Sequence, residues 1–316
     1  MTTTAPIAAA PAQPVEIEKI PDHRDRAREY AADFFAPPPP QIGTVISAES
    51  SLKQGKGGLP FIVRLIIALL AAGAVVAACM WAASGMRRQD GESLVIIGYI
   101  MAAIAAAIAM FVTRFKARCT YVGERGAIRY TLTRSRNATP KIELLLFDDA
   151  AEVHAAQTRQ FLNGVYTHTA YDYDWTDAAG KRLLRVKGQH RGNNAPPKPG
   201  DAWHFANAAE NAWSEHFLAR AQQQLKDEGS IAFRIDKRRV VRVGPGFLEF
   251  HFGEAPQRVT AEEIASVGLG GGHFSFKHKD AKWYSRSGKY TFSYGAMGNG
   301  KVFLFALEKL MGYRWE

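Results

Sequence analysis

Residues 61–84, FIVRLIIALLAAGAVVAACMWAAS, and residues 93–113, SLVIIGYIMAAIAAAIAMFVT, are two apolar stretches separated by a short polar connection. Apart from Arg64, neither stretch carries a charge. About 20 apolar residues are enough for a helix to cross about 30 Å of hydrocarbon. Core helices of a soluble protein rarely run this long without a polar residue, and a signal peptide would lie nearer the N-terminus. The two stretches therefore predict a transmembrane helical hairpin within residues 60–116.

Basic residues are unevenly distributed around this hairpin. Six flank its open end and two lie in its connecting loop: Lys53, Lys56, Arg64, Arg114, Lys116 and Arg118 against Arg87 and Arg88. Segments rich in Lys and Arg remain on the cytoplasmic side of a membrane. The sequence thus predicts a multi-pass membrane protein with both termini in the cytoplasm, and the lipid bilayer as its first partner.

Small residues recur at four-residue spacing in both stretches, as Gly73 with Ala77, Ala102 with Ala106, and Ala105 with Ala109. Such faces let helix backbones approach closely, so they predict packing within the hairpin or against other membrane proteins. The simpler interpretation is that alanine is common in this chain. No ionisable group lies at the centre of either span, which argues against transport by this chain alone.

Outside the hairpin the chain has the composition of a soluble protein with an excess of positive charge. The formal net charge of the 316 residues is +10, which favours anionic neighbours. The two cysteines, Cys79 and Cys119, would lie at opposite sides of a bilayer and cannot pair. Residues 1–59 are rich in Ala, Pro and Thr and are predicted to be a disordered tail.

Two regions after the hairpin, 117–228 and 229–316, show the same order of elements. Each begins with short segments of alternating β-branched and aromatic residues and ends with one amphipathic segment, predicted as a helix over about 208–226 and again over 300–311. Asn207 followed by Glu210 fits an N-cap and capping box for the first helix. The predicted fold class is a membrane-anchored α+β protein with two small antiparallel β units, each closed by a C-terminal helix; a single elongated β domain is the alternative.

The segments CTYVGERG at 119–126 and GNGKVFL at 298–304 carry a resemblance to the pleckstrin-homology-like domains of bacterial membrane proteins. In that family a short helical hairpin precedes a β-rich cytoplasmic domain that ends in a helix. The resemblance covers about 61–316 and implies a non-enzymatic binding or scaffolding platform. It assigns no binding residue.

The second region is the more basic, with 14 Lys and Arg against 8 Asp and Glu. The candidate binding residues form two groups: Lys237, Arg238 and Arg239, and then Lys277, Lys279, Lys282, Arg286 and Lys289. Basic residues close to a cytoplasmic leaflet attract anionic lipid. We therefore expect this region to bind anionic phospholipid headgroups, a peptide or a membrane complex, whereas nucleic acid is not expected for a membrane-tethered chain. A solvated charged face is the simpler interpretation.

Catalytic and metal-binding patterns are weak. His251, His273 and His278 lack partners at ligand spacing, and no metal or other cofactor is predicted. Asp172 and Asp174 lie two residues apart, as in the polar face of a β-hairpin. The glycine-rich stretch 268–272 lacks the context of a phosphate-binding loop and is expected to connect two strands. A membrane-tethered hydrolase with a His/Asp site, and an accessory subunit of a larger membrane complex, remain alternative hypotheses.

Overall fold

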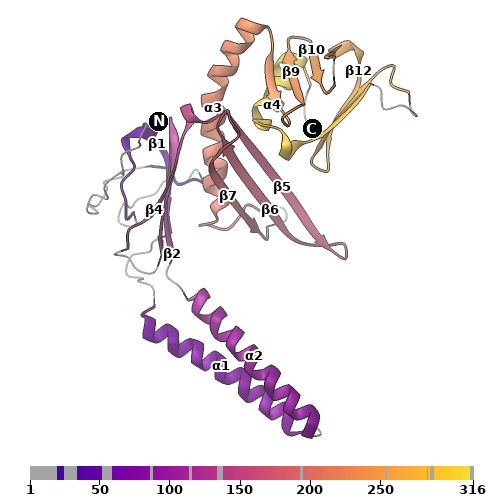
Figure 1. Cartoon of the computed structure of the whole chain (residues 1–316). Helices are drawn as coiled ribbons and strands as arrows, with labels where there is room; N and C mark the ends of the chain where they lie inside the picture. Colours follow the sequence, from indigo (N-terminus) through magenta and orange to yellow (C-terminus); the bar gives the residue numbers. More distant parts are fainter. Residues whose placement is uncertain are drawn as a thin grey trace.

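A computed structural model describes residues 20–24, 34–51, 59–85, 88–113, 116–133, 138–192, 195–253, 255–282, 284 and 288–313 (Figure 1). Two long paired helices extend away from a body of small antiparallel sheets and two further helices. The sheets account for most of the body, so the chain is an α+β protein.

The paired helices are α1 (Phe61–Ser84) and α2 (Arg88–Val112). Both are long and apolar enough to span a membrane, as the sequence predicts, although α2 begins five residues before residue 93. In the most apolar 18-residue stretch of each helix, only 6% of the residues of α1 and 11% of those of α2 are buried. Large side chains such as Leu70, Trp81 and Phe111 are therefore exposed along both helices.

The two helices approach most closely at glycines of α2. A Cβ atom added to Gly98 would lie 2.7 Å from the Cβ of Cys79, whereas no described atom lies within 4 Å of one added to Gly73. Ala102 is buried in the contact, as expected, but Gly73 and Ala77 are exposed on another side of α1. The prediction that the Gly73–Ala77 pair packs within the hairpin is therefore wrong, because the contact stripe of α1 runs through Ala68 and Cys79 instead.

Arg64 lies at the open end of the hairpin. Its guanidinium group donates to the carbonyl oxygen of Met110 at 2.5 Å and to the hydroxyl of Thr113 at 3.4 Å. The last carbonyls of a helix have no partner within the helix, so a cation from the neighbouring helix satisfies one of them. Arg64 thus joins the two helices.

The body contains the same order of elements twice. In the first β unit, a four-stranded sheet and a three-stranded sheet are followed by α3; in the second β unit, the same order ends in α4. A single 3₁₀ turn joins the two sheets of each unit, η2 (Phe147–Asp149) and η3 (Ala261–Glu263). The strands and helices of the first unit are β1 (Val45–Ser50), β2 (Lys116–Gly123), β3 (Gly126–Thr133), β4 (Lys141–Leu146), β5 (Glu152–Leu162), β6 (Val165–Thr176), β7 (Arg182–His190) and α3 (Ala202–Glu228). Those of the second unit are β8 (Ile231–Arg234), β9 (Val240–Gly244), β10 (Phe247–His251), β11 (Gln257–Thr260), β12 (Ile264–Gly270), β13 (His273–His278), β14 (Lys289–Ser293) and α4 (Gly300–Met311).

Strand β1 corrects the prediction that all of residues 1–59 form a disordered tail. It pairs antiparallel with β2, with Ser50 opposite Cys119, so the helical hairpin lies between two neighbouring strands of one sheet. Residues 34–42, which include the 3₁₀ turn η1 (Pro40–Ile42), cover the outer face of this sheet. There the ring of Phe34 stacks on Tyr121 at 5.2 Å. The rest of the expected tail, 1–19, 25–33 and 52–58, lies outside the described residues.

The start of α3 also differs from the prediction. Asp201, not Asn207, is the N-cap: its carboxylate accepts from the backbone N–H of Trp203 at 2.9 Å and from the hydroxyl of Tyr171 at 2.6 Å. Glu210, expected in a capping box, is instead a buried residue in the third turn, where burial raises its pKa. Gly229 ends the helix in the left-handed conformation.

One apolar core runs through both β units. Trp213 and Phe217 of α3 lie in the same cluster of buried side chains as Trp175 of the first unit and Phe303 of the second. Helix α3 therefore contributes to the core on both sides, and the two units share a hydrophobic interior.

The pairing of β1 with β2 predicts that the helical hairpin can be removed without unfolding the body. The backbone N–H of Ser51 still donates to the carbonyl of Arg118 at 2.9 Å, so the two chain ends lie side by side. Replacing residues 52–115 with a Gly/Ser turn of about four residues should give a water-soluble, folded protein. Detergent-free purification and a cooperative thermal transition by circular dichroism would check this; aggregation of the shortened chain would contradict it.

The close approach at Gly98 gives a matched pair of helix variants. Gly98→Leu should lower the stability of the helical pair by about 1–3 kcal/mol through overpacking against Cys79, whereas Gly73→Leu meets open space and should be tolerated. Thermal unfolding of both variants in detergent measures the difference. Equal transition temperatures would contradict this packing.

Candidate functional site

The first basic group lies in the tight connection between β8 and β9. Asp236 accepts from the backbone N–H groups of Arg238 and Arg239, both at 2.9 Å, and from the side chain of Arg239 at 2.7 Å. These bonds order the turn and hold the pKa of Asp236 below its usual value. Lys237 and Arg238 are left exposed.

The second basic group lies on β13, on β14 and in the connection between them. Lys277 stands directly opposite Lys289 in the pairing of these strands. Lys279 and Lys282 are exposed in the connection, with the Lys282 ammonium 5.9 Å from the ring centre of Tyr284. Arg286 lies outside the described residues. Like charges on opposite residues of paired strands repel, and an anion bound between them would relieve this repulsion.

Aromatic side chains connect the two basic groups. The Arg239 guanidinium lies 5.8 Å from the ring centre of Phe252, and Phe252 contacts Tyr290 with ring centres 5.9 Å apart. Tyr290 is the neighbour of Lys289 in β14 and also stacks on Phe250 at 3.8 Å. Arg239 and Tyr290, which are about 50 positions apart in the sequence, are therefore linked through Phe252. We call this surface the basic end, and its described members are Lys237, Arg238, Arg239, Lys277, Lys279, Lys282 and Lys289.

The candidate histidines do not converge. His251 bonds Glu249 at 2.5 Å, His273 bonds the carbonyl of Gly271 at 3.1 Å, and His278 accepts from the backbone N–H of Asp280 at 3.1 Å. Within the described ranges, no three His, Cys, Asp or Glu residues are grouped as they would be to hold a metal ion. The glycine-rich stretch 268–272 forms the end of β12 and a tight turn into β13, as expected of a strand connection.

The two carboxylates of β6 are both neutralised across the sheet. Asp174 accepts three hydrogen bonds from Arg182, at 2.8, 3.0 and 2.8 Å, and Asp172 accepts from Arg185. The bond from Arg185, more than any other influence, keeps the pKa of Asp172 below its usual value. Arg182 and Arg185 of β7 therefore each hold one of the two carboxylates in an ion pair.

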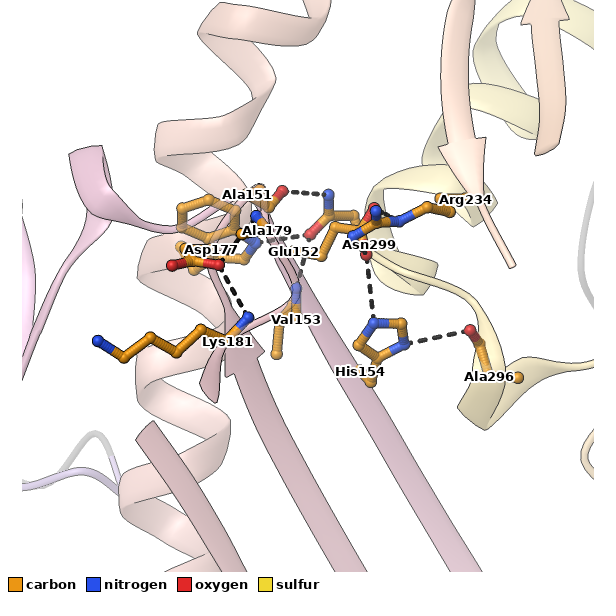
Figure 2. Close-up of polar contacts among 11 residues, drawn as sticks. Ala151, Glu152, Val153, His154, Asp177, Ala179, Lys181, Arg234, Ala296 and Asn299 are labelled. Atoms are coloured by element: carbon orange, nitrogen blue, oxygen red, sulfur yellow. Dashed lines mark hydrogen bonds and ion pairs between the residues drawn. The ribbon is translucent and has the colours of Figure 1, made fainter. Parts of the chain in front are cut away.

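A polar junction fixes the second unit, and with it the basic end, against the first (Figure 2). The side-chain oxygen of Asn299, at the start of α4, accepts from the backbone N–H of Val153 at 3.0 Å and from the indole of Trp213 at 2.8 Å. Asn299 adopts a left-handed conformation with φ 58°, which Asn tolerates better than most residues. Its amide also donates to Ala151 at 3.2 Å, so one side chain of the second unit bonds two elements of the first.

An ion pair lies beside this amide. Arg234 of β8 bonds both carboxylate oxygens of Glu152 on β5, at 2.8 and 2.9 Å, and His154 lies 3.3 Å from the same carboxylate while bonding the carbonyl of Ala296. Burial alone would raise the pKa of Glu152, but the hydrogen bonds from His154 and Arg234 outweigh it and lower the pKa. The two units are therefore held together both by apolar packing and by the ion pair between Arg234 and Glu152.

Comparison with known proteins adds no family assignment. No model of a known protein family matches the chain, and a search of curated proteins finds no significant match.

The lowered pKa of Glu152 predicts a pH-dependent contribution to stability. A carboxylate whose folded-state pKa is lowered stabilises the fold above its ordinary pKa of 4.5, and this contribution is lost as the pH falls through the lowered value. Glu152→Gln should cost about 1–2 kcal/mol at neutral pH and progressively less in acid. Denaturant unfolding monitored by tryptophan fluorescence would measure this, with the exposed Glu262→Gln as control. A difference that stays constant with pH would contradict the assignment.

Proposed function

We propose that the protein is a non-enzymatic integral protein of a bacterial inner membrane that presents a cytoplasmic binding module to anionic lipid. Helices α1 and α2 are its anchor, both termini lie in the cytoplasm, and the basic end is the lipid-binding surface. The observation that carries the proposal is that two groups of exposed basic residues belong to the second unit, where Phe252 links Arg239 of the first group to Tyr290, the neighbour of Lys289.

Exposure of the two apolar helices supports the anchor. Their large side chains lie open along nearly the whole length of the pair, and soluble monomers rarely expose contiguous apolar patches of more than a few hundred Å². Inside a bilayer the same side chains are solvated by lipid, and the helical backbone satisfies its own hydrogen bonds. The excess of Lys and Arg on the side of the β units supports a cytoplasmic location for them.

The repeated order of elements supports two pleckstrin-homology-like units. Four antiparallel strands, three antiparallel strands and a closing helix occur twice, in agreement with the resemblance at 119–126 and 298–304. One departure concerns the anchor: the helical hairpin lies between β1 and β2 instead of preceding the first unit. The first unit of the proposal therefore comprises residues 45–50 together with 117–228, and the second comprises 229–316.

The geometry of the basic end supports an anionic ligand. Exposed cations come from the β8–β9 turn and from the β13–β14 connection, and Phe252 links Arg239 of the turn to Tyr290 of β14. A surface of this kind attracts headgroups without a deep pocket, because each basic residue near an anionic leaflet contributes about 1 kcal/mol. The hydrolase hypothesis is disfavoured because Asp172 and Asp174 are held in ion pairs.

One observation favours the accessory-subunit hypothesis as a second candidate. Gly73 and Ala77 form a small-residue face that points away from α2, where a helix of another membrane protein could pack closely. This role is compatible with lipid binding by the basic end.

The lipid hypothesis predicts charge-dependent binding by the chain in which a short turn replaces residues 52–115. This soluble variant should float with vesicles of phosphatidylcholine containing phosphatidylglycerol, and high salt should release it. Changing Lys237, Arg238, Lys277 and Lys279 together to Ser should weaken binding at least about tenfold, since 1.4 kcal/mol corresponds to tenfold.

A matched control removes basic charge from the first unit. Lys181 and Lys187 are both exposed, and changing them to Ser should leave most of the vesicle binding intact. Binding that is indifferent to lipid charge, or equal loss in the control, would overturn the assignment of the basic end.

A further inference from the structure

Strands β5 and β6 extend beyond their sheet as a two-stranded arm. Strand β7 pairs with β6 only as far as Thr169, whereas β5 and β6 continue to pair up to Leu162 and Val165. Every residue from 157 to 162 is exposed. In Figure 1 the arm projects from the body toward the lower right, the direction in which the helical hairpin also runs.

The end of the arm is apolar. Asn163 and Gly164, with φ of 49° and 78°, form a tight turn, and the side chains on either side of it are exposed: Phe161 by 57%, Leu162 by 67% and Val165 by 68%. Three large apolar side chains at an unsupported turn are costly in water, because each loses the free energy of burial. We call these three residues the arm tip.

The arm is held in shape by its own polar contacts. The hydroxyl of Thr167 donates to the carbonyl of Gln160 at 3.1 Å, and the hydroxyl of Tyr166 donates to the carbonyl of Gly192 at 3.0 Å near the base of the arm. The ring of Tyr166 also contacts Phe161 with centres 5.9 Å apart. The tip is therefore presented on an ordered ribbon and does not fold back onto the body.

Polar and basic residues follow directly behind the apolar tip. Arg159 on β5 and His168 on β6 lie in the part of the ribbon next to it, with Tyr166 between them and the tip. From the tip inward, the arm therefore carries apolar side chains, then an amphipathic aromatic residue, then a basic residue. This order matches that of the lipid tails, the glycerol region and the anionic headgroups at a membrane surface.

We propose that the arm tip inserts into the lipid bilayer that holds α1 and α2, so that the first β unit contacts the membrane at a point separate from its anchor. The inference rests on the proposed anchor, since the tether keeps one bilayer surface permanently within reach and makes a weak insertion effective. The partner is thus the lipid interface of the cytoplasmic leaflet, bound by apolar contact, whereas the basic end binds by charge.

A position-specific fluorescent label tests this in the full chain reconstituted into vesicles of phosphatidylcholine and phosphatidylglycerol. In a Cys79→Ala background, with Cys119 left in place because it is fully buried, an NBD label is attached at Leu162→Cys. Two other positions serve as references: Ala178→Cys, exposed in the β6–β7 turn at the opposite end of the same sheet, and Ile104→Cys, exposed on α2. Each label is titrated with aqueous iodide and with nitroxide-labelled lipid.

Insertion predicts that the label at 162 is quenched by nitroxide lipid and is several-fold less sensitive to iodide than the label at 178. Iodide quenching at 162 equal to that at 178, while the label at 104 is quenched by lipid, overturns the inference and leaves the anchor standing. Absence of lipid quenching at 104 overturns the anchor and the inference together. Protection of 162 from both quenchers means that protein covers the tip, which also overturns insertion.

Discussion

The antiparallel pairing of β1 with β2 is the constraint on which the arrangement depends. It brings Ser50 opposite Cys119, so the chain enters and leaves the helical hairpin from two neighbouring strands of one sheet. The first sheet is thereby tied to the helices at two points, not one. Helix α3 then extends the core into the second unit, and Asn299 fixes that unit by three hydrogen bonds. These contacts join the basic end to the sheet from which the proposed anchor emerges.

Much of the fold could be predicted from the sequence because its signals are local. The apolar stretches are long and uninterrupted, and the second helix of the body begins at Gly300, as its apolar spacing indicates. The exposed lysines of the basic end were likewise recognisable from charge alone. The link between Arg239 and β14 was not, because it depends on the contacts of Phe252 with Arg239 and Tyr290, which no sequence spacing reveals.

The elements that the sequence did not reveal depend on tertiary contacts. Strand β1 follows a run of prolines typical of a linker, yet the carbonyls of Ala36 and Pro37 accept from the hydroxyls of Tyr121 and Tyr130. Strand β5 is largely polar and exposed, so it lacks the alternation of a half-buried strand. The dipeptide Asn163-Gly164 was an available signal, since it is the preferred sequence of a two-residue hairpin turn.

Insertion of the helices between neighbouring strands has a consequence for biogenesis. During translation β1 leaves the ribosome more than sixty residues before its partner β2, with the whole hydrophobic hairpin in between. The pairing of β1 with β2 can therefore form only after both helices have been synthesised. Until then β1 has no neighbour, and the apolar side of its sheet cannot form. Completion of the first sheet thus follows the synthesis of the two helices that the proposal places in the bilayer.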